Sequence, residues 1–259
     1  MDLVEARARG FETSVRHPWE RARLALVGQL IARHVSLQPG DAVLDIGCGD
    51  TFVVEALAQI YPAVQFYGVD NAFTGDLIEA FRAKLSVANV RLFGSLDAVS
   101  LTKPAALVLL MDVIEHVPDD VAFLNEICRR PYVSQDTRLL ITVPSFQSLF
   151  CSHDRFLGHY RRYSNRMLHR LFGRVKLASI EAGYLFASLL PVRVLQVVRE
   201  RIVGFTEAPT DLATWRGSDL KARALAAILT LDGRLALRLV RIGVRIPGLS
   251  TFAICRKSA

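Results

Sequence analysis

The chain has 259 residues, of which 51% are hydrophobic and 22% are charged, and its formal net charge is +7. This composition can fill the core of one large domain and excludes an intrinsically disordered protein. The four cysteines are widely spaced without a C-x-x-C pair, so neither a disulfide framework nor a zinc ribbon is indicated.

Charge is unevenly divided along the chain. Residues 1–144 carry 13 basic and 18 acidic residues, net −5, whereas residues 145–259 carry 19 and 7, net +12. Such a basic part suits nucleic acid, an anionic membrane surface or an acidic substrate, and charge alone does not choose between them. The longest apolar run, Ala182–Val192, is too short to span a membrane, and Met1–Gly10 lacks the apolar stretch of a secretory signal. We therefore expect a cytoplasmic protein.

Short β-rich runs alternate with helical runs up to Pro144. Strands such as ALVLLM and RLLITV are apolar throughout, which is typical of parallel strands covered on both faces by helices. The pattern predicts a doubly wound, Rossmann-like α/β sheet. The predicted elements are helix Trp19–His34, strand Ala42–Ile46, helix Phe52–Ile60, strand Gln65–Val69, helix Asp76–Leu85, strand Val90–Phe93, strand Ala106–Met111, helix Asp119–Arg130 and strand Leu139–Val143.

The pattern changes after Pro144. Ser145–Ser164 is polar, aromatic and basic, and it is too long for an ordinary connection, so we expect a functional loop. The elements predicted beyond it are helix Asn165–Phe172, strand Val175–Ile180, basic amphipathic helices Leu189–Val203 and Lys221–Ile242, and a last strand Leu249–Arg256. The expected organisation is an N-terminal helical cap (1–40), an α/β core (41–184), a helical insertion (185–248) and the last of about seven strands (249–259).

A glycine-containing turn follows the first predicted strand, in the segment Val43–Gly49 (VLDIGCG). Asp70 ends the next strand, 21 residues beyond Gly49, where a carboxylate suits a ribose diol. An ordinary tight turn is the alternative. Asp50, Thr51 and Phe52 follow the second glycine, so the G-x-G-x-x-G form of a dinucleotide fingerprint is absent, and Asp45 would repel a pyrophosphate but could hold an ammonium group. These two details favour S-adenosylmethionine over a dinucleotide.

With these motifs the sequence resembles the class I S-adenosylmethionine-dependent methyltransferases, particularly the branch that contains quinone-biosynthesis and other small-molecule enzymes. VLDIGCGD, FYGVD and LLMDVIEHVPDD match motifs of the family, and LGHYRRYS and AGY resemble its later signatures, over about Val43–Tyr184. The resemblance implies an enzyme that transfers a methyl group from S-adenosylmethionine. Thr51 replaces a glycine that is usual in the family, so helix packing against the cofactor could differ.

The resemblance also implies which residues bind the cofactor. Asp70 would bind both ribose hydroxyls, and the turn at Gly47 and Gly49 would surround the methionine part. The implied cofactor-binding residues are Asp45, Gly47, Cys48, Gly49, Asp70, Asn71, Ala72, Ser95, Leu96, Asp97, Met111 and Asp112.

Methyl transfer by in-line displacement requires alignment and exclusion of water, and a general base only where the acceptor must lose a proton. The candidate bases are His116, His153 and His159. An arginine-rich segment could clamp a phosphate or carboxylate of the acceptor, or it could tie the loop to the acidic edge of the sheet. The candidate acceptor-binding residues are Tyr160, Arg161, Arg162 and Tyr163, with His17 and Trp19 as a lid or as a packed helix start.

The acceptor is expected to be small and amphiphilic or anionic, because the segments on its side are apolar and rich in arginine. A nucleic-acid methyltransferase is the alternative that the basic charge suggests, but no N/D-P-P-Y tetrapeptide follows the fourth strand, where the chain reads MDVIEH. A cofactor-binding protein without catalysis is a third reading. The basic helices could lie on an anionic membrane or pack on the domain, a monomer and a homodimer are both open, and no metal site is expected.

Overall fold

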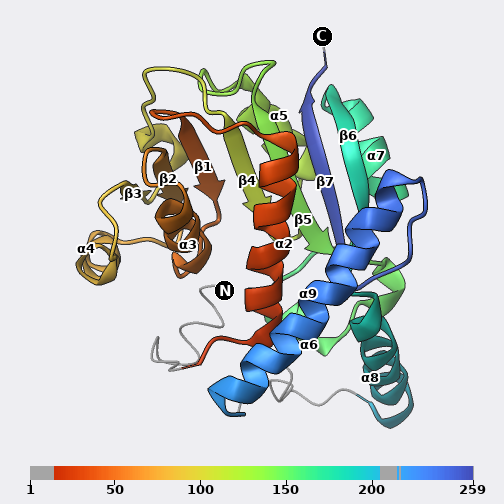
Figure 1. Ribbon diagram of the computed structural model, residues 1–259. Helices are drawn as coiled ribbons and strands as arrows, with labels where there is room; N and C mark the ends of the chain where they lie inside the picture. The colour runs from red at the N-terminus through yellow and green to blue at the C-terminus, as the bar shows by residue number, and fades with distance from the viewer. Residues whose placement is uncertain (1–14, 205–214, 216, 259) are drawn as a thin grey trace.

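A computed structural model describes residues 15–204, 215 and 217–258 of the chain. Seven strands form one sheet in the order β3-β2-β1-β4-β5-β7-β6 (Figure 1). The neighbours from β3 to β5 are parallel, whereas β7 is antiparallel to both β5 and β6. The strands are β1 (Ala42–Ile46), β2 (Gln65–Val69), β3 (Val90–Phe93), β4 (Leu107–Met111), β5 (Arg138–Pro144), β6 (Leu177–Leu185) and β7 (Ser250–Lys257).

Helices cover both faces of this sheet. Because successive strand residues point to opposite faces, Val43 of β1 belongs to the buried cluster that includes side chains of α2, α3 and α9, and Leu44 belongs to the other cluster, which includes side chains of α5 and α7. The predicted Rossmann-like α/β fold is therefore confirmed, with the helical insertion before the last strand. The helices are α2 (Pro18–His34), α3 (Phe52–Ile60), α4 (Gly75–Lys84), α5 (Asp120–Arg129), α6 (Ser152–Phe156), α7 (Asn165–Arg174), α8 (Leu190–Val203) and α9 (Asp219–Arg241).

Two predicted segments differ from the structure. The strand expected to start at Val175 starts at Leu177, because Val175 is the C-cap of α7 and Lys176 takes a left-handed conformation (φ 53°). That strand also continues to Leu185 along β7, beyond the expected core boundary at residue 184. The predicted long loop contains helix α6 and a 3₁₀ turn at Gln147–Leu149, so it is more ordered than its composition indicated.

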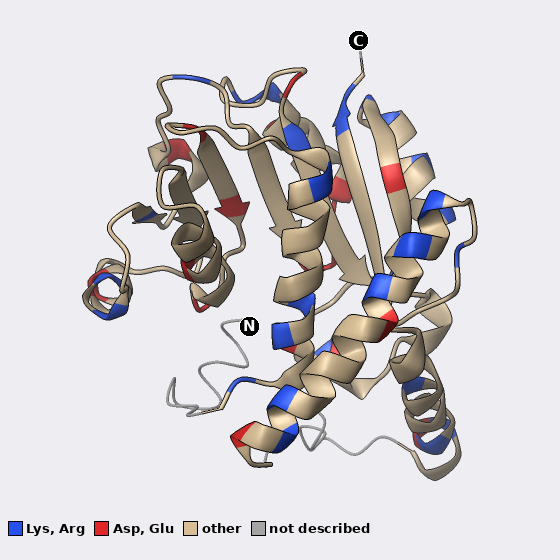
Figure 2. Ribbon diagram, viewed as in Figure 1, with Lys and Arg blue, Asp and Glu red and all other residues tan. Residues whose placement is uncertain are grey.

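Helix α9 is a structural part of the body. It crosses α2 in front of the sheet (Figure 1), and its inner side buries Leu229 and Leu237 in the same core as Leu26 of α2. An ion pair of 2.7 Å between Arg21 and Asp219 joins the two helices. Figure 2 shows basic residues spaced along the length of α9. Within the part of the chain described, no helix combines the length and the apolar character needed to cross a membrane.

We expect Gly233→Ala to lower the free energy of unfolding by about 1–3 kcal/mol, because a methyl group there would overpack the core between α9 and α2. A Cβ on Gly233 would lie 2.2 Å from Cδ1 of the buried Leu26. The matched control is Gly173→Ala in α7, where the added Cβ meets no atom within 4 Å and helix propensity favours alanine. Urea denaturation measures both, and equal gains in stability would contradict this packing.

Candidate functional site

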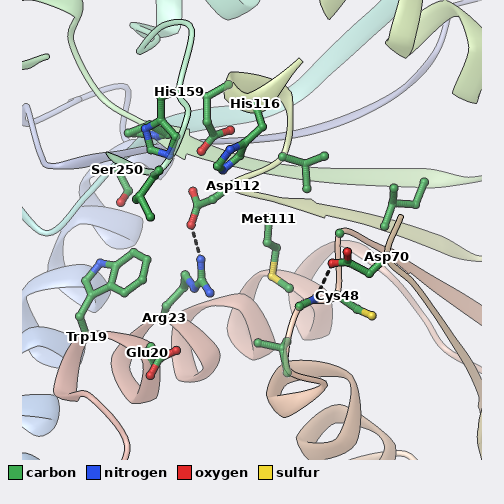
Figure 3. Close-up of a pocket in the computed structure, with 18 of the residues that line it drawn as sticks. Trp19, Glu20, Arg23, Cys48, Asp70, Met111, Asp112, His116, His159 and Ser250 are labelled. Carbon is green, nitrogen blue, oxygen red and sulfur yellow. Dashed lines mark hydrogen bonds and ion pairs between the residues drawn. The ribbon is translucent and has the colours of Figure 1, made fainter. Parts of the chain in front are cut away.

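A cavity of about 1190 Å³ lies at the carboxyl ends of the central strands (Figure 3). It extends beyond β1, β2 and β4, at the point where the strand order reverses between β1 and β4. Ligands of open α/β sheets bind in the crevice at such a reversal. Helix α2 forms one wall, and the segment 153–162 together with α8 forms another. The cavity thus has a sheet-edge end and a helical end.

The turn after β1 positions Asp70 at the sheet-edge end. Gly47 and Gly49 have φ of 72° and 58°, left-handed values that favour glycine. One Asp70 carboxylate oxygen accepts the Gly49 N–H at 3.0 Å, and the other accepts the Ala72 N–H, also at 3.0 Å. The backbone therefore fixes the orientation of this carboxylate at the edge of the cavity.

Asp45 lies within β1, 1% exposed, and does not line the cavity. Neither of its carboxylate oxygens has a hydrogen-bond partner in the described structure. Burial raises the pKa of Asp45 to about 7, although the positive charge of Arg23 opposes this shift. Asp45 is thus a buried acid that lacks a cationic or donor partner in direct contact.

Thr51 has the backbone conformation of a glycine. Its φ is 65°, a left-handed value that is unusual for a β-branched residue and costs roughly 1–2 kcal/mol. The residue is buried, and α3 still begins at Phe52 as predicted. The substitution therefore stores backbone strain beside the turn without displacing the helix.

An ion pair between Arg23 and Asp112 connects α2 to the end of β4 across the cavity (Figure 3). Asp112 also accepts a hydrogen bond of 3.3 Å from Thr142, and its φ is 56°. The Arg23 guanidinium lies 4.4 Å from the centre of the Trp19 ring. Arg23 was not among the residues predicted from the sequence, although it falls on the same helical face as the buried Leu26 and Leu30, which was the available signal.

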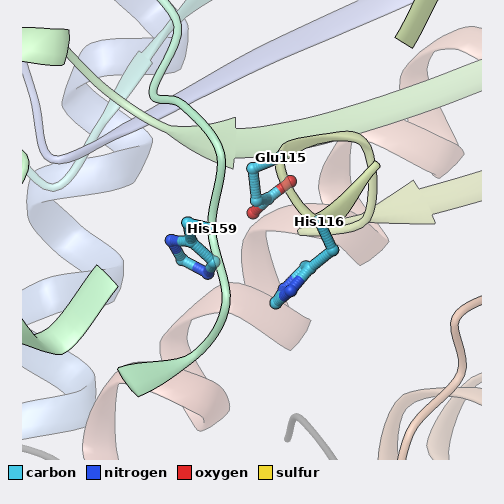
Figure 4. Close-up of side chains that lie close together, drawn as sticks. All are labelled: Glu115, His116 and His159. Carbon is cyan, nitrogen blue, oxygen red and sulfur yellow. The ribbon is translucent and has the colours of Figure 1, made fainter. Parts of the chain in front are cut away.

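Glu115, His116 and His159 lie together at the cavity wall (Figure 4). The two imidazole rings are 4.5 Å apart and nearly perpendicular. Glu115 is fully buried, and both its oxygens lack hydrogen-bond partners among the described residues. Burial is the main reason why the pKa of Glu115 lies well above its ordinary value, and the negative charge of Asp112 raises it further. Potential ligand atoms of the three residues lie within 4.8 Å of one another, a spacing that one cation could bridge, although the sequence indicated no metal site.

Asp154 organises the helical end of the site. It is fully buried and accepts hydrogen bonds from Nδ1 of His159 at 2.9 Å and from Nε of Arg162 at 2.8 Å. Burial alone would raise the pKa of Asp154, but these two partners lower it far below the ordinary value. His153 also lines the cavity, and burial followed by the charge of Arg193 lowers its pKa to about 4, so its imidazole is neutral at pH 7.

Three of the side chains predicted as candidates for acceptor contact, Arg161, Arg162 and Tyr163, bind groups of the protein itself. Arg161 pairs with Asp120 at 3.2 Å, and the Tyr163 hydroxyl donates to the same carboxylate at 2.8 Å. Arg162 lines the cavity but is bound to Asp154 and to the Ser145 carbonyl, whereas Tyr160 is 55% exposed and lies outside the lining. The contact between Arg161 and Asp120 is of the kind expected in the alternative interpretation, in which an arginine ties the loop to the acidic edge of the sheet.

Most of the other predicted residues meet at this one cavity. His17 is also the N-cap of α2, where its Nδ1 accepts the Trp19 N–H at 3.2 Å. The predicted residues that line the cavity are His17, Trp19, Gly47, Cys48, Gly49, Asp70, Asn71, Ala72, Ser95, Leu96, Asp97, Met111, Asp112, His116, His153, His159 and Arg162. Lining residues that the sequence analysis did not select include Glu20, Arg23, Glu115, Arg193 and Gln196.

We expect Asp45→Asn to be more stable than the wild type near pH 8, by about 1 kcal/mol or more, and similar to it near pH 4. The unfolded chain ionises Asp45 near 3.8, whereas the folded protein keeps it protonated up to about 7, so this carboxyl lowers stability as the pH rises between these values. Unfolding across this range measures the difference. Asp41→Asn is the control with the opposite trend, because hydrogen bonds from Gln38 and Lys103 outweigh burial and lower the pKa of Asp41. Parallel curves for the wild type and Asp45→Asn would contradict this assignment.

The comparisons with known proteins agree with this architecture. A family profile described as a methyltransferase domain matches residues 18–182, whereas a comparison with curated proteins finds no match. Coclaurine N-methyltransferase bound to N-methylheliamine and SAH superposes with a TM-score of 0.56 at 14% identity, over 90% of this chain and 70% of that one. The plantazolicin methyltransferase BpumL in complex with SAH has a TM-score of 0.55 at 16% identity, over 99% and 89% of the two chains. YcgJ from Bacillus subtilis has a TM-score of 0.53 at 20% identity, over 91% and 98%. The chain therefore belongs to the methyltransferase domain family, and its fold is that of the class I S-adenosylmethionine-dependent methyltransferases.

Proposed function

We propose that the protein transfers a methyl group from S-adenosylmethionine to a small acceptor that is amphiphilic or anionic. The protein is a methyltransferase, and S-adenosylmethionine is its cofactor, in agreement with the SAH complexes of similar folds. The observation that carries the proposal is the orientation of Asp70 by two backbone N–H groups, at one end of a cavity that continues past the histidines to a helical wall.

The residues at the sheet edge fit this cofactor. Asp70 presents a fixed carboxylate that can accept the two ribose hydroxyls, and the segment 95–97 lines the same end of the cavity, where an adenine would lie. Asp45 lies beneath the turn without a hydrogen-bond partner among the described residues, so the positive charge of the methionine ammonium nearby would favour its ionised form. When bound, S-adenosylmethionine supplies an electrophilic methyl group on a sulfonium.

The helical end of the cavity suits an apolar acceptor body. Trp19 of α2, Leu189 and Val192 near the start of α8, and Leu225 and Leu229 of α9 all line it. These side chains would exclude water around the acceptor and align it with the cofactor, which is the main requirement of an in-line displacement. This lining supports an amphiphilic small molecule.

His159 is the histidine best placed to take a proton from the acceptor. Asp154 stays ionised and accepts Nδ1–H of His159, which leaves Nε2 as the proton-accepting atom. His153 is neutral at pH 7. The ring of His116 makes a T-shaped contact with the ring of His159. His159 would therefore act as the general base, with Asp154 as its positioning residue.

The finer classification rests on sequence motifs. The segment LGHYRRYS supports the branch that contains quinone-biosynthesis enzymes, and cytoplasmic localisation stays a prediction. A nucleic-acid acceptor is less favoured, because Arg23, Arg161 and Arg162 at this edge are each paired with a carboxylate and do not present free positive charge.

We expect Asp70→Ala to weaken S-adenosylhomocysteine binding by about tenfold or more, because it removes a charged acceptor of two hydroxyl hydrogen bonds. Isothermal titration calorimetry measures the affinity. Asp76→Ala removes an exposed aspartate from the first turn of α4 and should bind like the wild type. Equal affinities of the two variants would reject the proposed ribose site.

The outer face of α8 supports peripheral contact with an anionic membrane, from which an amphiphile could enter the cavity. Val197 is the α8 residue buried against the body, whereas Leu195, Val198 and Ile202 are 69%, 45% and 78% exposed. Arg199 is exposed beside them, and the acid of this segment, Glu200, is held by Ser152. Apolar residues flanked by arginine match a surface of anionic lipid.

We expect the double variant Leu195→Glu, Ile202→Glu to lower sedimentation with phosphatidylserine-containing phosphatidylcholine vesicles by about tenfold, because it places acids in the contact face. Ile60→Glu, at the 61% exposed end of α3, is the matched control. A wild-type protein that does not sediment with these vesicles would exclude membrane docking, and self-association that the double variant abolishes would identify this face as a contact between two copies.

A further inference from the structure

Arg193 lines the helical end of the cavity without a carboxylate in direct contact among the described residues. Its guanidinium Nη1 contacts the Cys151 sulfur at 2.8 Å and the Gln196 amide oxygen at 3.1 Å, and both partners are neutral. The thiol stays protonated, because burial raises the pKa of Cys151. In the described parts of the chain no carboxylate lies within ion-pair distance of Arg193.

Two acids, Asp154 and Glu200, attract the charge of Arg193, but both already accept hydrogen bonds from other groups. Asp154 accepts from His159 and Arg162 with one oxygen and from the Cys151 N–H with the other. Glu200 accepts from the backbone and hydroxyl of Ser152 and from Gln196. The two acids attract Arg193 only at longer range, so its outer N–H groups remain available to the cavity.

This lack of a partner has an electrostatic consequence. Burial, followed by repulsion from Arg162, lowers the pKa of Arg193. Buried charges in proteins are normally paired, and a guanidinium prefers a planar carboxylate or a phosphate as its partner. The cavity wall therefore contains a site for an anion, which the paired Arg161 and Arg162 do not provide.

We propose that Arg193 is the subsite for a carboxylate or phosphate group of the methyl acceptor. The inference rests on the proposed function and identifies the acceptor as an anionic amphiphile. Gln196 lines the same wall and has a second amide N–H besides the one donated to Glu200, while Trp19, Leu225 and Leu229 enclose the apolar part. The anionic group would lie at the α8 end, and the atom to be methylated would lie between His159 and the sheet edge.

The test compares octyl phosphate, octanoate and neutral octanol by calorimetry, with and without S-adenosylhomocysteine. The wild type should bind at least one anionic probe about tenfold more tightly than octanol, and the preferred probe separates phosphate from carboxylate. Arg193→Gln should lose about tenfold for that anion while its affinities for octanol and S-adenosylhomocysteine stay unchanged. Arg170→Gln, at an exposed arginine of α7 outside the cavity lining, is the matched control.

An anion affinity that is equal in the wild type and Arg193→Gln, or no better than that of octanol, would overturn the inference. If Arg193→Gln unfolds, competition in the wild type decides: inorganic phosphate should displace the preferred anionic probe but not octanol, and failure to do so also overturns it. A wild-type protein that does not bind S-adenosylhomocysteine would reject the proposed function. This measurement is independent of the anion titrations.

Discussion

The site depends on one constraint, the reversal of strand order between β1 and β4. The chain leaves these adjacent parallel strands in opposite directions, so a crevice opens where their carboxyl ends meet. Gly47 and Gly49 turn the backbone away from the crevice, and Asp70 closes one end by accepting backbone N–H groups. Left-handed conformations at Thr51 and Asp112 lie beside this edge, which places backbone strain where a ligand would bind.

Some charged groups around the cavity form ion pairs, and others have no partner in direct contact among the described residues. Arg23 with Asp112, and Arg162 with Asp154, are paired and hold α2 and the segment 153–162 in place. Among the described residues, Asp45 and Glu115 are buried without hydrogen-bond partners, and burial raises the pKa of both, which favours their protonated forms. Among the described arginines that line the cavity, Arg193 is the one that has no carboxylate in direct contact.

The proposed acceptor agrees with the residues that α8 and α9 contribute to the cavity. Helix α9 contributes Leu225 and Leu229 to the cavity through the inner side of a helix whose outer side is basic. Helix α8 contributes Arg193 from its first turn and exposes Leu195 and Ile202 outward. In the described part of residues 145–259, basic side chains thus pair within the loop, lie on the outer surface of α9 and, at Arg193, face the cavity.

The sequence by itself determined the layered fold, because apolar periodicity and turn residues are local signals, and the predicted bounds of α3, β1, β2 and β3 are those of the structure. It also placed Asp70 and the turn at Gly49 at one cavity, since consecutive parallel strands end at the same edge. Only the tertiary structure decided that Arg161 and Tyr163 bind Asp120, and that Arg193 faces the cavity. The ion-pair partner of a long side chain depends on which distant segments pack around it, and composition and residue spacing do not predict that packing.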